Sequence, residues 1–449
     1  MARKVFISVL GTGFYGKCKY TRGEYNSVKA SETRFIQQST LEYLNVYDWS
    51  KNDAAIFLLT SKAKSQNWNR EIKSRVNFST KEEEEYLGLE YVLEQMNLPV
   101  EIRPVDIVDG KDEDEMWEIF NALFNELKDG DELYFDLTHS FRYIPMLVLV
   151  LGNYSKFLKN VTIKSITYGN YEAREDNNAP IVDLLPLSAL QDWTYAAGQF
   201  LENGNVSRLQ HLCNEELKPI LREAKGSDLE ATNLKKFINT LADVIDERVT
   251  CRGMSIIKSE SFRKMKNVSD KLETTKIEPL NPVFDKIKKS MVSFDENENI
   301  MNGFSAAVWC FKNGLLQQSA TILQEFVITF VCSRHGIQID DEGKRDWVTS
   351  AFAIKCNNLA EKDWRLNKEP EVAEIQKERI KQILADDLFA SCDFVNAFVS
   401  LSEVRNDYNH SGMRSVRKPM STNNIKNNIE KCINVFEDLL FNIKPNSSC

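Results

Sequence analysis

The sequence contains no hydrophobic run that could cross a membrane. Its longest apolar stretch, IPMLVLVLG at residues 144–152, is far shorter than the roughly 20 residues that a spanning helix needs. The first residues, MARKVFISVL, do not have the pattern of a signal peptide. These absences predict a cytoplasmic protein without a membrane partner.

Cysteine pairs that could hold zinc are also missing. The nine cysteines include no CxxC pair and no Cys/His cluster at zinc spacing, so reduced cytosolic thiols are expected, with no metal or other cofactor. Basic residues are not in excess, since the formal net charge is −9. An acidic chain is not expected to coat nucleic acid in general, although a local basic site can still bind a ligand.

The 449 residues fall into two parts with different sequence patterns. The first, up to about residue 185, alternates short strand-like segments with helix-like ones. Strands are expected at residues 4–10, 54–60, 100–108, 132–137, 161–168 and 181–185, and helices at 32–44, 81–96, 112–127 and 144–158. This alternation predicts an α/β domain with a mostly parallel sheet that helices cover on both faces.

Long amphipathic segments follow after about residue 187. Helices are expected at residues 215–224, 229–247, 304–334, 375–388 and 393–407. Residues 250–300 are rich in lysine and weakly patterned, which predicts an insertion or a mobile connector. The second half is therefore expected to be all-α, with a helical connector at 186–300 and a last domain at 301–449.

Three glycines follow the first predicted strand. Gly11, Gly13 and Gly16 spell GxGxxG, the form of the dinucleotide-binding fingerprint. That fingerprint requires a helix that starts inside the motif, yet no helical period begins before Glu32, and the next strand begins only near Ala54. NAD and FAD are therefore not expected. Glycines at the carboxyl end of a parallel strand still let the backbone approach a ligand closely, and a tight turn without a ligand is the alternative.

A second loop, DLTHSFRYIP, follows the predicted strand at 132–137. It places hydroxyl, imidazole and guanidinium groups at the same edge of the sheet: Thr138, His139, Ser140 and Arg142. Hydroxyls, helix-start amides and an arginine together suit a phosphate ligand. For Asp136 and His139 the alternative is a local hydrogen bond that shapes the turn, and we expect this role for Asp136.

A first strand ending in GTGFY with a later DLTHSFRYIP resembles the CRISPR-associated Rossmann-fold (CARF) domain. The usual second loop of that family is DxTHGFRxxP, and Ser140 stands here at the glycine position. The resemblance covers residues 1–185 and implies a Rossmann-like domain that binds a cyclic oligoadenylate. The ligand-binding residues that it implies are Gly11, Thr12, Gly13, Phe14, Tyr15, Thr138, His139, Ser140 and Arg142.

Another motif, SEVRNDYNHSG, stands near the end of the chain. Arg405 and His410 form an R-x4-H pair after an apolar-striped segment, and Gly412 follows as a helix stop. Histidine can transfer protons near neutral pH, and arginine stays charged and contacts phosphate oxygens. Such a pair can move a proton and stabilise negative charge on a phosphate without a metal ion. A histidine that only stabilises the helix dipole is the alternative.

The spacing of this pair has a geometric consequence. Two residues five positions apart on a helix are separated by about 140° around its axis. Arg405 and His410 therefore share one face poorly unless the helix ends at His410. The motif resembles that of HEPN ribonucleases, and CARF joined to HEPN is the layout of ancillary ribonucleases of type III CRISPR defence. The resemblance implies a homodimer with two Arg–His pairs in one cleft, an RNA substrate, and an orienting role for Asn406.

The function expected on this basis is a metal-independent endoribonuclease that a cyclic oligoadenylate activates. A non-catalytic cyclic-nucleotide sensor, whose helical half serves dimerisation or partner binding, is the alternative. Cleavage of the ring in the CARF pocket is a further open activity. Glu325 is expected to pair with an arginine near the site or to be solvated. His211 and His335 have no partner in the sequence, and core or surface roles are expected for them.

Overall fold

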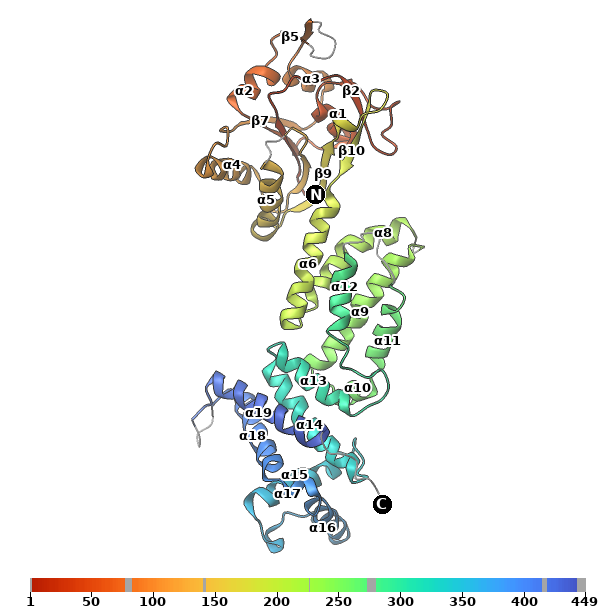
Figure 1. Ribbon diagram of the computed structural model, residues 1–449, viewed down its shortest axis with the longest axis vertical. Coiled ribbons are helices and arrows are strands. Elements are labelled where there is room, and N and C mark those ends of the chain that lie inside the picture. Colours follow the sequence, from red (N-terminus) through yellow and green to blue (C-terminus); the bar gives the residue numbers. More distant parts are fainter. Residues whose placement is uncertain are drawn as a thin grey trace. The chain divides into compact units, whose positions relative to one another are not determined.

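The computed structural model describes residues 2–76, 83–139, 143–225, 227–272, 280–413 and 418–441. The chain divides into two compact units, Met1–Ala189 and Leu190–Cys449, whose elements are labelled in Figure 1. Among the helices in the described ranges, none combines the length and apolar character that a bilayer-spanning segment needs. The boundary predicted at residue 300 stays a prediction.

An eight-stranded sheet forms the centre of the N-terminal unit, in the order β3-β2-β10-β9-β8-β1-β4-β7. Its strands are β1 (Lys4–Leu10), β2 (Cys18–Thr21), β3 (Glu32–Thr33), β4 (Ala54–Leu59), β7 (Glu101–Asp106), β8 (Glu132–Asp136), β9 (Thr162–Gly169) and β10 (Asn178–Asp183). Neighbouring strands from β9 to β7 are parallel, whereas β10 is antiparallel to β9 and β2 to β3. The predicted α/β fold with a mostly parallel sheet is confirmed.

Helices cover both faces of this sheet. The residues of β1 alternate between two apolar clusters: Val5, Ile7 and Val9 belong to one, and Phe6 and Leu10 to the other. The first cluster includes residues of α4 (Glu113–Glu126) and α5 (Ile144–Lys159), and the second includes residues of α1 (Ile36–Tyr43) and α3 (Leu89–Met96). Because successive side chains point to opposite faces, a strand covered on both sides is apolar along its length.

Two of the predicted helices begin later than expected. The segment predicted at 81–96 is helical only in α3, because Glu83–Tyr86 forms β6, which pairs antiparallel with β5 (Lys73–Val76). Arg75 lies opposite Glu84 in this hairpin, so opposite charges face each other across the strands. The helix predicted at 32–44 begins at Ile36, because Glu32–Thr33 pairs with β2 as β3. Tertiary pairing therefore overrides local helix propensity in both places.

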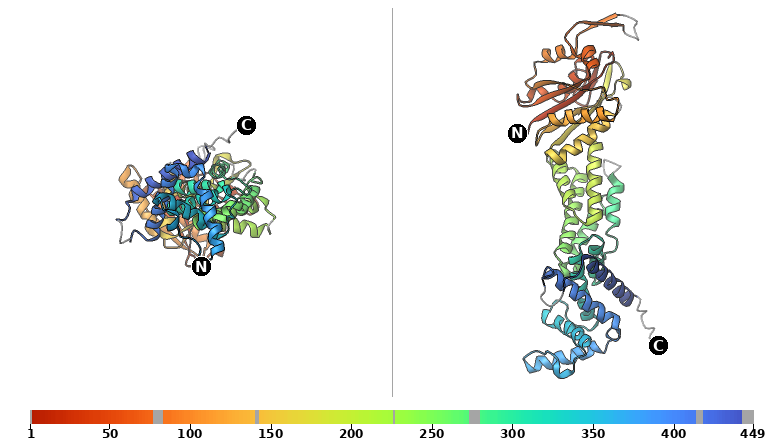
Figure 2. Two further views of the ribbon diagram at one scale, coloured as in Figure 1. Left: turned by 90° about the horizontal axis from the view of Figure 1, so that it is seen from below. Right: turned by 90° about the vertical axis from the view of Figure 1, so that its left-hand side faces the viewer.

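The described part of the C-terminal unit contains helices and no strand, as predicted (Figure 2). The helix α6 (Leu185–Asn203) leads into it. The others are α7 (Ser207–Leu212), α8 (Lys218–Glu223), α9 (Leu229–Val249), α10 (Gly253–Lys258), α11 (Glu260–Ser269), α12 (Asn281–Lys289), α13 (Met301–Lys312), α14 (Leu316–Arg334), α15 (Glu342–Asn357), α16 (Pro370–Leu384), α17 (Asp387–Ala390), α18 (Cys392–Asn409) and α19 (Thr422–Phe441). One apolar cluster runs through this unit from Trp193 to Phe436.

The single helix predicted at 304–334 is wrong. The chain turns between α13 and α14, where Gly314 has a left-handed backbone (φ 74°) that glycine adopts without strain. The lysine-rich region contains α10, α11 and α12, whose buried Phe262, Phe284 and Ile287 join the apolar cluster. Short amphipathic helices therefore form in this region, although its sequence pattern is weak.

Candidate functional site

The first candidate site lies where β1 and β8 end side by side. These strands are parallel with Ser8 opposite Asp136, so the glycine loop and the Thr-His loop leave the sheet at the same edge. A side-chain carbon placed on Gly11 would lie 3.2 Å from the carbonyl oxygen of His139. The two loops predicted to share this edge are therefore in close contact.

The Tyr15 side chain folds back over the glycines. Its ring stacks on the His139 ring, with centroids 3.8 Å apart and an interplanar angle of 19°. A side-chain carbon on Gly11 would overlap the Tyr15 hydroxyl, and one on Gly13 would lie 3.0 Å from Tyr15 Cε1. Burial raises the pKa of the Tyr15 phenol, while the backbone amides of Gly13 and Gly11 favour its ionised form. The glycines are thus needed for this placement of the tyrosine ring.

The His139 imidazole is buried beneath the Tyr15 ring. Its Nε2 is buried and has no hydrogen-bond partner among the described residues. Burial lowers the pKa of His139 to about 4, so the imidazole is neutral near pH 7. A buried polar atom without a partner is costly, and a ligand that bonds to Nε2 would remove this cost.

Asp136 and Thr138 hold the start of the second loop. Asp136 accepts hydrogen bonds from Ser8 Oγ (2.7 Å) and Thr138 Oγ1 (2.6 Å), and burial raises its pKa. The Thr138 hydroxyl also accepts a bond from the amide of Gly169 (2.8 Å). The role expected for Asp136, a hydrogen bond that shapes the turn, is confirmed. A ligand contact of Thr138 stays a prediction.

The remaining predicted ligand residues have different surroundings. Phe14 contacts the Tyr86 ring edge-to-face at 5.6 Å, and the carbonyl of Thr12 faces Arg75 Nη1 at 3.5 Å. Ser140 and Arg142 lie outside the described residues. The glycine loop therefore has an aromatic side and a basic neighbour from the β5–β6 hairpin.

Sequence analysis missed two residues that hold the glycine loop. Asn67 is buried and donates hydrogen bonds from Nδ2 to the carbonyls of Gly11 (2.8 Å) and Gly13 (2.9 Å). Arg34, also buried, donates to the carbonyl of Tyr15 (2.6 Å) and forms an ion pair with Glu84. The sequence signal for Asn67 was that its segment follows β4, the strand beside β1, and so begins at the same edge of the sheet.

The second candidate site lies at the end of α18. This helix ends at Asn409, and His410 is its C-cap residue. Ser411 and Gly412 both have positive φ angles (53° and 69°), and the Gly412 amide donates to the carbonyl of Asp407 (2.8 Å). This is the Schellman arrangement that stops a helix. The helix therefore ends where Ser411 and Gly412 indicated, and His410 is exposed at the cap.

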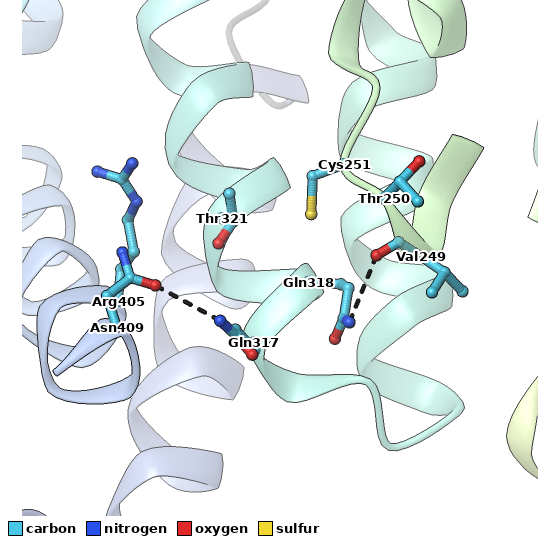
Figure 3. A pocket seen from close by; sticks show the side chains of 8 residues that line it. All are labelled: Val249, Thr250, Cys251, Gln317, Gln318, Thr321, Arg405 and Asn409. Carbon is cyan, nitrogen blue, oxygen red and sulfur yellow. Dashed lines mark hydrogen bonds between the residues drawn. The ribbon is translucent and has the colours of Figure 1, made fainter. Parts of the chain in front are cut away.

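Arg405, one turn earlier, lines a pocket of about 260 Å³ between α18, α14 and the turn that follows α9 (Figure 3). Its Nε is buried without a partner, and its guanidinium has no carboxylate partner among the described residues. The other lining residues are mostly polar: Val249, Thr250, Cys251, Gln317, Gln318, Thr321 and Asn409. The pocket thus offers a cation and several hydrogen-bonding groups to an anionic ligand.

His410 and Asn406 do not line this pocket. Asn406 is half-buried and His410 is exposed, so one chain does not bring the imidazole and the guanidinium into a shared pocket. Their predicted catalytic roles stay predictions.

Three other residues named from the sequence have clear surroundings. Glu325 pairs with Arg345 of α15 (2.6 Å), which is one of the two outcomes expected for it. His335 Nε2 lies 3.0 Å from Asp386 Oδ2, and His211 is exposed. No group of three or more His, Cys, Asp or Glu in the described ranges could hold a metal ion.

The family comparison decides the nature of the N-terminal unit. A family model described as "CRISPR system endoribonuclease Csx1, CARF domain" matches residues 5–172, a range that includes both loops and the sheet from β1 to β9. The N-terminal unit is a CARF domain. The CARF resemblance seen in the sequence is thereby confirmed, and the Tyr15–His139 stack lies in the CARF domain.

Two individual proteins are similar to this chain. The CRISPR-associated protein MJ1674 of Methanocaldococcus jannaschii is 29% identical over 234 residues, which are 51% of this chain and 34% of that protein. The chain thus spans about a third of the length of this curated relative. A solved structure, Enterococcus italicus Csm6 bound to cyclic hexa-2′-fluoro-hexa-dAMP, aligns over 100% of this chain and 96% of that one, with 11% identity and a TM-score of 0.45. That likeness is too loose to add to the CARF assignment.

Proposed function

We propose that this CRISPR-associated protein is a homodimeric endoribonuclease that cleaves single-stranded RNA without a metal ion and is activated by a cyclic oligoadenylate. The observation that carries the proposal is Arg405, a half-buried guanidinium in a polar pocket, five residues before the histidine that caps α18. No carboxylate of the described residues pairs with it. An arginine buried for structural reasons is normally paired. An unpaired one is suited to an anionic ligand such as phosphate.

The proposed chemistry uses the RNA's own 2′-hydroxyl as the nucleophile. His410 takes the proton from this hydroxyl, and its oxygen attacks the adjacent phosphorus. The bond to the 5′-oxygen of the next nucleotide breaks, and a second histidine or water returns a proton to that oxygen. Arg405 stabilises the negative charge on phosphorus, and Asn406 orients the pair. The products are a 2′,3′-cyclic phosphate and a 5′-hydroxyl.

We place this chemistry between two copies of the chain. In one chain His410 does not line the Arg405 pocket, and its exposed position at the end of α18 leaves it free to face a second copy. A two-fold axis beside α18 would bring two Arg405–His410 pairs into one RNA cleft. The non-catalytic sensor remains the alternative, and the unpaired Arg405 does not favour it.

We place the activator at the carboxyl edge of the CARF sheet. The backbone of Gly11 and Gly13 and the unpartnered Nε2 of His139 meet there. A ring of linked adenylates can contact the same residues of two protomers, because both the ring and the dimer have two-fold symmetry. The ring activates cleavage only if it binds one arrangement of the dimer more tightly than another.

The deciding experiment incubates the full-length protein with labelled single-stranded RNA and one cyclic oligoadenylate at a time, with and without EDTA. We expect cleavage with one ring size only, no effect of EDTA, and product ends that carry a 2′,3′-cyclic phosphate. Sensitivity to EDTA or a 3′-hydroxyl product would contradict the metal-free mechanism. Binding of a ring without cleavage of RNA would favour the non-catalytic sensor.

A further inference from the structure

A polar stripe runs along one face of α14. Its members, Gln317, Thr321, Glu325 and Thr329, follow one another at intervals of four residues, which places them on the same side of the helix. The stripe begins beside Arg405 and ends at Arg345, whose Nη1 donates to Thr329 Oγ1 at 2.9 Å. Arg405 and Arg345 thus lie at the two ends of this row of polar residues.

A second pocket, of about 390 Å³, adjoins the Arg405 pocket along this stripe. The two pockets share Cys251 and Thr321 as lining residues. The second pocket differs in character because most of its walls are apolar: Met254, Ile257, Ile300, Ile322, Phe326 and Ile339. Two adjoining pockets of different polarity suit one ligand that has an anionic part and a flat apolar part.

Glu325 is the polar group best placed to form a hydrogen bond with such a ligand. Its Oε2 is bonded to Arg345, which is itself fixed by hydrogen bonds to Thr329 Oγ1 and the carbonyl of Ile339 (2.9 Å each). Its other oxygen, Oε1, accepts no hydrogen bond from a described residue, and the side chain lines the second pocket. Arg345 therefore holds a carboxylate in place and leaves one of its oxygens free.

We propose that the second pocket is a nucleobase-binding subsite of the RNA cleft and that Glu325 determines its specificity. This inference rests on the proposed ribonuclease function. The base packs among the apolar walls, while the RNA phosphate lies at Arg405 in the adjoining pocket. The free carboxylate oxygen accepts a hydrogen bond from the exocyclic amino group of adenine, cytosine or guanine. Uracil has no amino group, and its one donor on this edge, N3–H, lies between two carbonyl oxygens that repel the carboxylate.

The test uses four RNAs of uridine that differ only at one central position, which is A, C, G or U. With saturating activator, we expect the wild type to cleave beside A, C or G at least about tenfold faster than beside U, the ratio that one good base contact provides. Glu325→Gln should bring this ratio below about threefold, because the amide can also donate to uracil carbonyls. Glu378→Gln, an exposed glutamate of α16, is the matched control and should keep the wild-type ratio.

A binding measurement makes the result independent of catalysis. The same four RNAs, fluorescently labelled, are titrated against His410→Ala protein with and without Glu325→Gln, and their affinities are compared by anisotropy. Selectivity that survives Glu325→Gln in both assays would overturn the subsite, as would a wild type that treats the four RNAs alike. Selective binding by the His410→Ala protein, together with a wild type that never cleaves RNA, would instead contradict the ribonuclease function and leave the subsite in place.

Discussion

Tyr15 and His139 stack face to face at the carboxyl edge of the CARF sheet, with ring centroids 3.8 Å apart. The tyrosine hydroxyl lies against the backbone amides of Gly11 and Gly13. A bound adenylate would likewise place a flat ring and an oxygen atom against backbone amides at this edge. The glycine loop is therefore the place to separate activator binding from RNA chemistry.

Gly11→Ala is expected to disturb this stack, because the added methyl group would overlap the Tyr15 hydroxyl and approach His139. Crowding of this kind typically costs about 1–3 kcal/mol, so the activator concentration for half-maximal RNA cleavage should rise about tenfold or more. Gly13→Val should act in the same direction. The measurement is an activator titration with labelled RNA, in which cleavage at saturating activator is largely retained.

The matched control for the glycine variants is Gly198→Ala, since a side-chain carbon there would meet no atom within 4 Å. This variant should need the same activator concentration for half-maximal RNA cleavage as the wild type. Activator curves of Gly11→Ala and Gly13→Val that coincide with the wild-type curve would contradict the placement of the activator at these glycines.

His410→Ala is expected to reduce activator-stimulated RNA cleavage at least about a hundredfold, because positioned proton transfer contributes at least this much. Binding of the cyclic oligoadenylate should be unchanged. Cleavage is followed with labelled RNA and ring binding by calorimetry. His211→Ala, which removes an exposed histidine of α7, should behave like the wild type. Near wild-type cleavage by His410→Ala would show that the catalytic residue lies elsewhere.

The burial of His139 predicts a pH dependence of the CARF domain's stability. Its pKa is lowered by burial to about 4, whereas an unfolded histidine titrates near 6.5. The unfolded state therefore binds more protons between these values. The contribution to stability is complete above about pH 6.5 and falls as the pH drops towards 4, by up to about 3 kcal/mol.

Hydrogen exchange of the β1 and β8 amides at pH 7.0, 5.5 and 4.5, corrected for the intrinsic exchange rate, measures this loss of stability. His139→Gln should show a smaller loss than the wild type, because glutamine does not titrate in this range. Equal losses in the two proteins would mean that His139 is not the group responsible.

Asn67→Ala is expected to destabilise the CARF domain by about 2 kcal/mol, since it removes two hydrogen bonds to the carbonyls of Gly11 and Gly13. Urea denaturation followed by hydrogen exchange of the glycine loop measures the effect. Asn52→Ala, at an exposed turn residue, should change the stability by less than about 0.5 kcal/mol. If the two variants were equally stable, the hydrogen bonds of Asn67 would not hold the loop.

Much of the CARF domain could be predicted from the sequence, because its elements depend on local patterns. The apolar run of β1 indicates a strand covered on both faces, and the alternation of strands with helices indicates a parallel sheet. In a parallel sheet, loops that follow neighbouring strands meet at one edge. This rule correctly predicted that the loops containing Gly11 and His139 lie side by side. The Ser411-Gly412 pair likewise marked the end of α18, because a helix stop is a local conformation.

Other features depend on contacts between residues far apart in the chain. The acidic segment at Glu83–Tyr86 is a strand because β5 pairs with it. The local sequence of this segment does not indicate that pairing. Asn67 holds the glycine loop from 54 residues away along the chain. The Arg405 pocket joins the end of α9, the start of α14 and the end of α18, which only helix packing brings together. Local patterns determined the elements and the edge where loops meet, whereas packing of the apolar cluster decided which polar side chains share a pocket.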